Sequence, residues 1–176
     1  MIVPGVLITL VTFPGVMVHE LAHCLFCRWT GTRILRVCYF RLGNPAGFVI
    51  HERPTSVWKS ILIGVGPLFV NTAAGFAIAL LAIVLHRSLH LREWLFAALL
   101  WLAVSVSMHS FPSSGDARTI WDALWSKGAP ITARLVGTPL VGLIYLGALA
   151  SIFWLDLVYG VGVAIGLPFL LHILPA

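Results

Sequence analysis

The chain has 176 residues, of which 60% are hydrophobic and only 10% charged, and its mean hydropathy is +1.00. Soluble domains carry roughly 25% charged and 45–50% apolar residues, so this composition excludes an ordinary soluble domain and indicates an integral membrane protein. The formal charge of +5 does not indicate nucleic-acid binding, because the basic residues stand at the ends of apolar runs, where they anchor helices at the interface. We therefore expect the lipid bilayer, and no nucleic acid, as a partner.

The first third of the chain contains one apolar run and one polar segment. A membrane-spanning helix needs about 20 mostly apolar residues, and the first such run covers about residues 2–27. The segment that follows is too polar to span a membrane, and β-branched and aromatic residues flank its Gly43-Asn44-Pro45 sequence. This pattern predicts a β-hairpin with strands at about residues 34–40 and 47–50.

Further apolar runs follow at about residues 57–85 and 94–107. A cluster of Pro, Ser and Gly ends the later run at membrane depth, where irregular backbone is tolerated only if it is buried in protein or lines a wet cavity. Residues 116–127 then have the pattern of a short amphipathic helix at the interface. The apolar length from about 131 to 175 suffices for two more spans, with a break near residues 156–160.

These runs predict an all-α polytopic membrane protein with about five transmembrane helices and a short membrane-associated β-hairpin between the first two. We expect one membrane-embedded domain over residues 1–176, with its core in residues 1–118 and two C-terminal helices in residues 131–175. No cleaved signal peptide is expected. Arg and Lys are concentrated between the first two spans, so the positive-inside rule places the hairpin in the cytoplasm and the N-terminus outside.

The sequence His19-Glu20-Leu21-Ala22-His23 stands near the end of the first apolar run. Histidines four residues apart share one face of a helix, so both imidazoles can bind a single metal ion. Glu20 is then able to act as general base on a water that the metal activates, as in a metal-dependent hydrolase. Ionisable residues in an apolar span are costly unless compensated, and bound Zn²⁺ compensates them, so we expect Zn²⁺ rather than a structural polar cluster.

A catalytic zinc ion takes three protein ligands and leaves one position open. Asp116 follows the proline-containing break on the cytoplasmic side, which the end of the first span also reaches, and it is the best-placed third ligand. Cys27 continues the row of His19 and His23, but a straight helix separates the first and last of these by about 12 Å of rise. The full set of candidates is Asp116, Asp122, Asp156, Glu52, Glu93, Cys27 and His109.

Three ordered motifs together resemble the site-2 protease family of intramembrane zinc metalloproteases. They are the HELAH run at residues 19–23, Gly66-Pro67-Leu68-Phe69-Val70-Asn71 and Phe111-Pro112-Ser113-Ser114-Gly115-Asp116. The resemblance implies a three-helix catalytic core with His19, His23 and Asp116 as zinc ligands and Glu20 as the catalytic residue. It also implies that Asn71 and His109 contact the substrate or support the site, and that the hairpin is membrane-associated.

The leading functional prediction is therefore proteolysis within the membrane, with the active site near the cytoplasmic side and a transmembrane helix of another protein as substrate. A strand edge at residues 37–40 or 48–50 is able to accept an unwound substrate as an added strand. Two alternatives remain open. One is a catalytically silent relative that binds membrane proteins, and the other is a membrane zinc hydrolase that acts on a lipid or a lipidated peptide.

Overall fold

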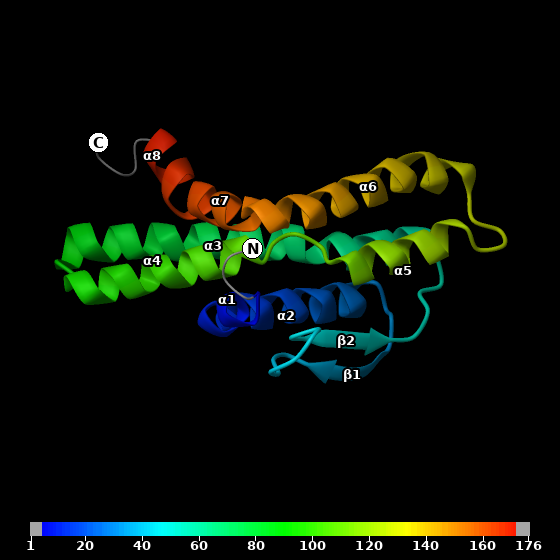
Figure 1. Ribbon diagram of the computed structural model, residues 1–176, viewed down its shortest axis with the longest axis horizontal. Helices are drawn as coiled ribbons and strands as arrows, with labels where there is room; N and C mark the ends of the chain where they lie inside the picture. Colours follow the sequence, from blue (N-terminus) through cyan, green and yellow to red (C-terminus); the bar gives the residue numbers. More distant parts are fainter. Residues whose placement is uncertain (1–4, 172–176) are drawn as a thin grey trace.

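The computed structural model describes residues 5–171, so the predicted start of the first span at residue 2 and the end of the last at residue 175 lie outside the described residues. The chain is mainly helical, with one small sheet (Figure 1). In chain order the elements are α1 (Gly5–Val11), α2 (Phe13–Trp29), β1 (Ile34–Cys38), β2 (Phe48–His51), α3 (Val57–Leu89), α4 (Glu93–Met108), α5 (Ser114–Leu124), α6 (Ile131–Ala150), the 3-10 turn η1 (Ser151–Phe153), α7 (Leu155–Val161), the π-helical turn η2 (Gly162–Gly166) and α8 (Leu167–Leu170).

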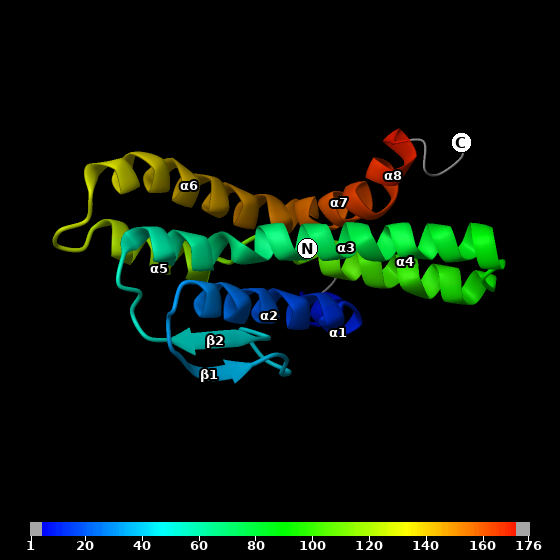
Figure 2. The ribbon, with the colours of Figure 1, turned by 180° about the vertical axis from the view of Figure 1, so that it is seen from behind.

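Helix α3 has 33 residues and lies at the centre of the molecule (Figure 1). Ser56 caps its start, where the Ser56 hydroxyl accepts a hydrogen bond from the Lys59 amide, and His90, which follows its last residue, has a left-handed conformation. Helix α4 lies alongside its C-terminal half, while α5 lies beside its N-terminal half. Helix α2 and the hairpin lie on one side of α3, and α6 and α7 lie on the opposite side, as both views show (Figures 1 and 2).

The predicted hairpin is present, with slightly different ends. β1 and β2 pair antiparallel, with Val37 opposite Val49 and Cys38 opposite Phe48. In both ribbon views β2 lies between β1 and α2, so the edge of β2 that does not pair with β1 faces the helices. The hairpin thereby brings its connecting loop close to the HELAH run of α2.

Close packing positions α2 against the end of α4. A Cβ atom at Gly15 would collide with the backbone oxygen of Ser105, so only glycine allows this approach. The Ser105 hydroxyl then accepts a hydrogen bond from the Gly15 amide at 3.2 Å and donates one to the carbonyl of Thr12 at 3.0 Å. Small and hydroxyl-bearing residues at helix contacts are typical of membrane bundles.

A second group of contacts holds α5 in place between α3 and α6. The apolar side chains of this cluster are completely or almost completely buried, and they come from all three helices: Val57, Ile61, Val65, Ala117, Ile120, Ala123, Leu124, Ala133, Val141 and Ile144. Because α5 is fixed along its buried face, its first turn, which carries Asp116, has a defined position relative to α3.

Two of the predicted boundaries are wrong. The first apolar run is two helices rather than one, because Pro14 lacks the amide hydrogen that a continuous helix would need there. The C-terminal break lies at residues 151–154, where Trp154 has a φ of 65°, and residues 156–160 belong to α7. The sequence did not signal this turn, because left-handed backbone at a bulky non-glycine residue is uncommon.

Within the described residues, two helices are both long and apolar enough to cross a membrane, namely α3 and the helical stretch Ile131–Phe153. The apolar helix Glu93–Met108 and the stretch Leu155–Leu170 are shorter than this requires. The prediction of about five transmembrane helices is therefore supported for two of them.

Candidate metal centre

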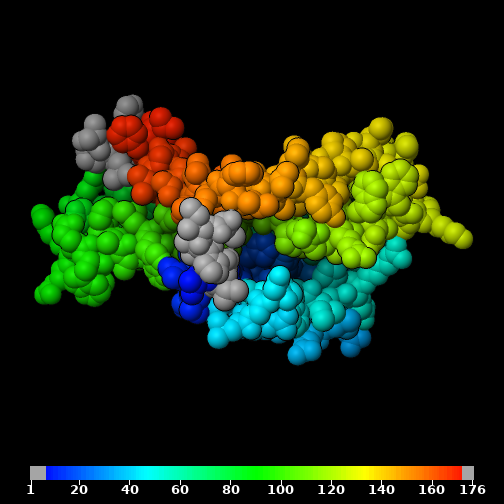
Figure 3. Space-filling view, in the orientation of Figure 1, coloured from blue at the N-terminus to red at the C-terminus, as the bar shows by residue number. Residues whose placement is uncertain are grey.

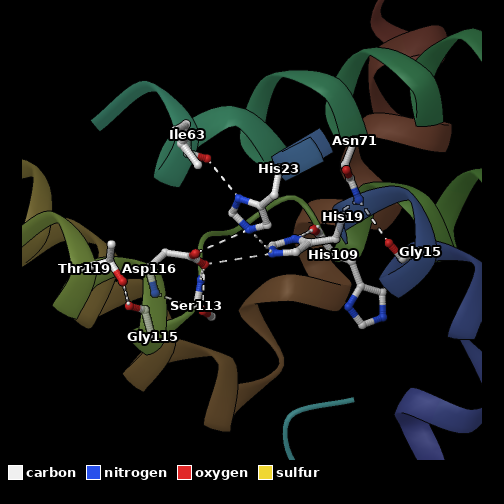
Figure 4. A network of polar contacts seen from close by, with 10 residues as sticks. All are labelled: Gly15, His19, His23, Ile63, Asn71, His109, Ser113, Gly115, Asp116 and Thr119. Carbon is white, nitrogen blue, oxygen red and sulfur yellow. Dashed lines mark hydrogen bonds and ion pairs between the residues drawn. The ribbon is translucent and has the colours of Figure 1, made fainter. Parts of the chain in front are cut away.

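Helix α2 presents His19 and His23 on one face, one turn apart, and the first turn of α5 brings Asp116 to them (Figure 4). The Nε2 atoms of the two histidines lie 3.1 Å apart. One carboxylate oxygen of Asp116 is 3.3 Å from Nε2 of His23, and the other is 4.0 Å from Nε2 of His19. The structure thus brings together three residues that lie far apart in sequence.

The spacing of these atoms fits one zinc ion. Tetrahedral zinc with bonds of about 2.0–2.1 Å places neighbouring ligand atoms about 3.3 Å apart. One ligand atom from each of His19, His23 and Asp116 can be chosen so that all lie within 4.8 Å of one another. The donor set of two imidazoles and one carboxylate is also one that catalytic zinc uses.

The ring orientation of His23 is fixed by a carbonyl group of α3. Nδ1 of His23 donates to the backbone oxygen of Ile63 at 2.9 Å, which leaves Nε2 as the nitrogen with a free lone pair. In a regular helix the Ile63 oxygen would accept from the amide four residues later. That residue is Pro67, which has no amide hydrogen, so the oxygen of Ile63 is free to accept from the histidine.

His19 is oriented in the same way by the end of α4. Its Nδ1 donates to the backbone oxygen of His109 at 2.8 Å. This oxygen also lacks a helical donor, because Pro112 has no amide hydrogen and the amide of Ser113 donates to Asp116 instead. Both imidazoles therefore direct Nε2 to the same point, which is the orientation that metal-binding histidines need.

Asn71 joins three helices behind this arrangement. Its Nδ2 lies 3.2 Å from the backbone oxygens of Gly15, Val106 and His109, so its two hydrogens are shared among three acceptors. The side chain is fully buried and does not line the cavity described below. Asn71 therefore does not contact the candidate metal site directly. It contacts the His109 carbonyl, which accepts a hydrogen bond from His19.

Asp116 is held by the start of its own helix. The Ser113 hydroxyl accepts from the Asp116 amide at 3.2 Å, and the Asp116 carboxylate accepts from the amide and hydroxyl of Ser113 at 2.7 and 2.6 Å. This capping box fixes the carboxylate at the first turn of α5. Burial raises the pKa of Asp116, but the His23 and His19 imidazoles in their protonated form, together with hydrogen bonds from His23 and Ser113, outweigh this effect and hold the pKa below its usual range.

Comparison with known protein families agrees with this geometry. The family described as "Putative zincin peptidase" matches residues 12–129, which is more than half of the chain. The chain belongs to this family. No curated protein and no solved structure matches it significantly.

Membership of the zincin peptidase family supports a zinc metallopeptidase and zinc as its metal, and the matched residues run from the start of α2 to the loop after α5. Four of the other candidates for a third ligand, Glu52, Glu93, Asp122 and Cys27, lie elsewhere. Glu52 lies 3.4 Å from Arg33, Glu93 lies 3.8 Å from His86 near the loop that joins α3 to α4, and Asp122 is exposed on α5. Cys27 is buried in α2 and does not join the group.

Glu20 lies against the loop of the hairpin. Its side chain is 7% exposed, and it packs so closely on Gly47 that a Cβ atom there would lie 2.6 Å from Cγ of Glu20. Glycine at position 47 therefore lets the loop cover the glutamate without displacing it. The contact of Gly47 with Glu20 cannot be predicted from the sequence, because a contact between a loop and a helix leaves no local pattern.

The group formed by His19, His23 and Asp116 opens into a cavity of about 740 Å³. In the space-filling view, the dark blue atoms of α2 lie at the bottom of a hollow between the cyan hairpin and the orange C-terminal segment (Figure 3). Its walls include residues of the hairpin, the start of α3, the connection between α4 and α5, and the end of α6. His109 and Asp156 also line this cavity.

Proposed function

We propose that this zincin peptidase is an intramembrane metalloendopeptidase of the site-2 protease type, with a transmembrane protein as substrate. The observation that carries the proposal is the convergence of His19, His23 and Asp116 at a cavity among apolar helices, with Glu20 in the same cavity. Three protein ligands leave one coordination position open for catalysis.

The surface of the helices supports a position within the membrane. Large apolar side chains are exposed along α3, α4 and α6, among them Leu62, Phe69, Leu81, Val84, Trp94, Trp101, Leu135, Leu143, Leu146 and Leu149. A soluble monomer rarely exposes so much contiguous apolar surface, whereas lipid chains solvate it. We infer that α2 and the shorter apolar helices also cross or enter the bilayer, giving about five membrane-embedded helices, with the hairpin and the active site towards the cytoplasm and the N-terminus outside.

The proposed chemistry uses the chain's own residues as follows. When bound, zinc supplies Lewis-acid chemistry, which makes a water molecule acidic enough to lose a proton near neutral pH. Glu20 accepts this proton while the water oxygen attacks the peptide carbonyl, and Glu20 then returns a proton to the departing amine. The substrate must be extended at the cleaved bond, because a helix shields its carbonyl groups.

His109 and Asn71 have supporting roles in this proposal. His109 lines the cavity, where its side chain is able to contact the substrate, while its carbonyl orients His19. Its Nε2 lies 2.9 Å from the hydroxyl of Thr12, at the break between α1 and α2. Asn71 acts behind the site by supporting the carbonyl of His109.

The proposal is tested with the variants Glu20→Gln and Asp116→Ala, and with Glu52→Gln as a matched control at an exposed glutamate. Membrane proteins that persist in cells with Glu20→Gln, but are shortened in cells with the wild-type chain, identify substrates. Cleavage of such a substrate by the purified protein is expected to fall about 10²- to 10⁴-fold in Glu20→Gln, because the general base is lost. Asp116→Ala is expected to lose stoichiometric zinc.

The control Glu52→Gln is expected to keep both zinc and cleavage. Full cleavage by Glu20→Gln would refute the assigned general base, and full zinc content in Asp116→Ala would refute the third ligand. If zinc binds but no membrane protein is shortened by the wild-type chain, the peptidase proposal fails in favour of a binding protein or a hydrolase of another class.

A further inference from the structure

Asp156 is a carboxylate in the wall of the cavity that the proposed chemistry does not use. It stands in the first turn of α7, just after the helix break at Trp154, in an otherwise apolar C-terminal segment. It lines the same cavity as His19, His23 and Asp116 but does not belong to the metal-binding group. It also lies outside the residues that the family match covers.

Within the described part of the chain, no cation pairs with this carboxylate. The cavity lining contains neither Lys nor Arg, and among the ion pairs of residues 5–171 none includes Asp156. Its Oδ1 accepts a hydrogen bond from the adjacent Leu157 amide at 3.0 Å. By contrast, the other two carboxylates of the cavity, Glu20 and Asp116, lie beside the histidines. The proposed zinc ion and proton transfer explain why these two carboxylates are there.

A structural role for Asp156 is the simplest alternative. An acidic residue in the first turn of a helix interacts favourably with the helix dipole, at typically 0.3–1 kcal/mol. This gain is small compared with the several kcal/mol that an ionised group can cost within an apolar membrane segment. A half-buried carboxylate that lines a polar cavity, with no Lys or Arg of residues 5–171 paired with it, is available to a partner of opposite charge.

We propose that Asp156 forms a subsite for a basic side chain, Lys or Arg, in the substrate segment next to the cleaved bond. This inference rests on the proposed function and names the substrate class that suits it. Transmembrane helices carry Lys and Arg mainly on their cytoplasmic flank, which is the side where the active site is proposed to lie. A substrate that enters from the membrane would therefore bring a basic residue to the cavity.

The placement of the walls suits such a substrate. The loop and strand β2 of the hairpin form one wall and the segment that contains Ala148, Ser151 and Asp156 forms another, with α2 at the bottom of the hollow between them (Figure 3). An extended peptide that follows β2 presents alternate side chains towards opposite faces. A basic side chain on the face away from α2 and towards α7 would meet Asp156.

The test uses synthetic peptides that share one membrane-flanking sequence and carry Lys, Ala or Glu at each position around the cleaved bond in turn. Binding is measured to the inactive variant Glu20→Gln, loaded with zinc in detergent, and cleavage is measured with the active protein. At one position we expect Lys to bind at least about tenfold more tightly than Ala, and Glu more weakly than Ala, as one charge contact predicts.

Three variants assign this preference to Asp156. Asp156→Asn is expected to bring the Lys-to-Ala ratio close to one, Asp156→Glu to retain it, and Asp156→Lys to transfer the preference to the Glu peptide. Asp122→Asn, at an exposed carboxylate on α5, is the matched control and is expected to keep the wild-type ratio. The melting temperature of each variant identifies those that fail to fold.

A Lys preference that persists in Asp156→Asn, or no charge preference at any position, would overturn the subsite. A lower melting temperature in Asp156→Asn with unchanged ratios would assign the residue a structural role and also overturn it. The proposed function fails in a different way: the active protein would not cleave any peptide in a Glu20-dependent manner, although the inactive variant still prefers Lys.

Discussion

The orientation of His23 depends on a proline in another helix. Pro67 leaves the carbonyl of Ile63 without a helical donor, and Nδ1 of His23 uses that carbonyl. Pro67 is thus a positioning residue, and it belongs to the Gly66-Pro67 motif noted in the sequence.

Replacing Pro67 with Ala is expected to weaken zinc binding about tenfold or more, because an amide at position 67 would compete with His23 for the oxygen of Ile63. The measurement is zinc affinity by competition with a chelator. Pro139→Ala is the matched control, since Pro139 also lies inside a helix but is exposed and does not line the cavity. Equal affinity in both variants would show that the Ile63 carbonyl does not orient the metal ligand.

The contact between Gly47 and Glu20 gives a second prediction. Gly47→Ala places a methyl group against the glutamate side chain and is expected to lower kcat by about 10²-fold while zinc content stays unchanged, because a displaced general base is poorly aligned. Gly43→Ala is the control in the same loop, where the added carbon meets only Arg41 at an ordinary 3.7 Å. A normal kcat in Gly47→Ala would mean that Glu20 tolerates displacement or has another role.

Part of the site could be predicted from the sequence, and the physical reason is local periodicity. His19 and His23 share a helix face by their spacing alone. Asp116 could be predicted because a polar, proline-containing break in an apolar chain costs free energy unless it lines a site. The carbonyls of Ile63 and His109 could not be predicted in the same way, since every residue carries a carbonyl. The only sequence signal for these two carbonyls is the pair of prolines at 67 and 112, which lack the amide hydrogens that would otherwise compete for the carbonyl oxygens.

At the level of helices, Asn71 connects α3 to both α2 and α4 through backbone oxygens. Asn71→Ala is expected to lower the free energy of unfolding by about 1–3 kcal/mol, because buried carbonyls of three residues lose a donor. Thermal unfolding in detergent measures this, with Thr138→Ala on the exposed face of α6 as control. A melting temperature equal to that of the control would contradict the connecting role.

Helix positions followed from the apolar runs, whereas breaks within them did not. The hairpin, α3, α4 and α5 lie close to their predicted ranges, because charges and turn residues bound them. The break at Trp154 lies a few residues before the predicted range of 156–160, because left-handed backbone at a bulky residue leaves no sequence signal. Tertiary contacts hold α7 after this turn: the hydroxyl of Tyr159 lies 2.7 Å from that of Thr72, and its ring packs on Phe111.

For the molecule as a whole, the distribution of charge predicts its orientation in the membrane. A cysteine at Leu42, in the hairpin loop, is expected to react with a membrane-impermeant maleimide only after cells are broken, whereas one at Ser88, near the end of α3, is expected to react in intact cells. Both positions are exposed. The native cysteines Cys24, Cys27 and Cys38 are replaced with Ala in both variants, and the reverse labelling pattern would invert the proposed topology.

The separation of the metal-binding residues along the chain has a consequence for synthesis. His19 and His23 leave the ribosome early, but Asp116 follows 93 residues after His23, counted from their positions. At about 5–20 residues per second, this delay is roughly 5–20 s. During that time the two histidines lack their carboxylate partner, so a metal site that needs all three residues cannot be complete before α5 has docked.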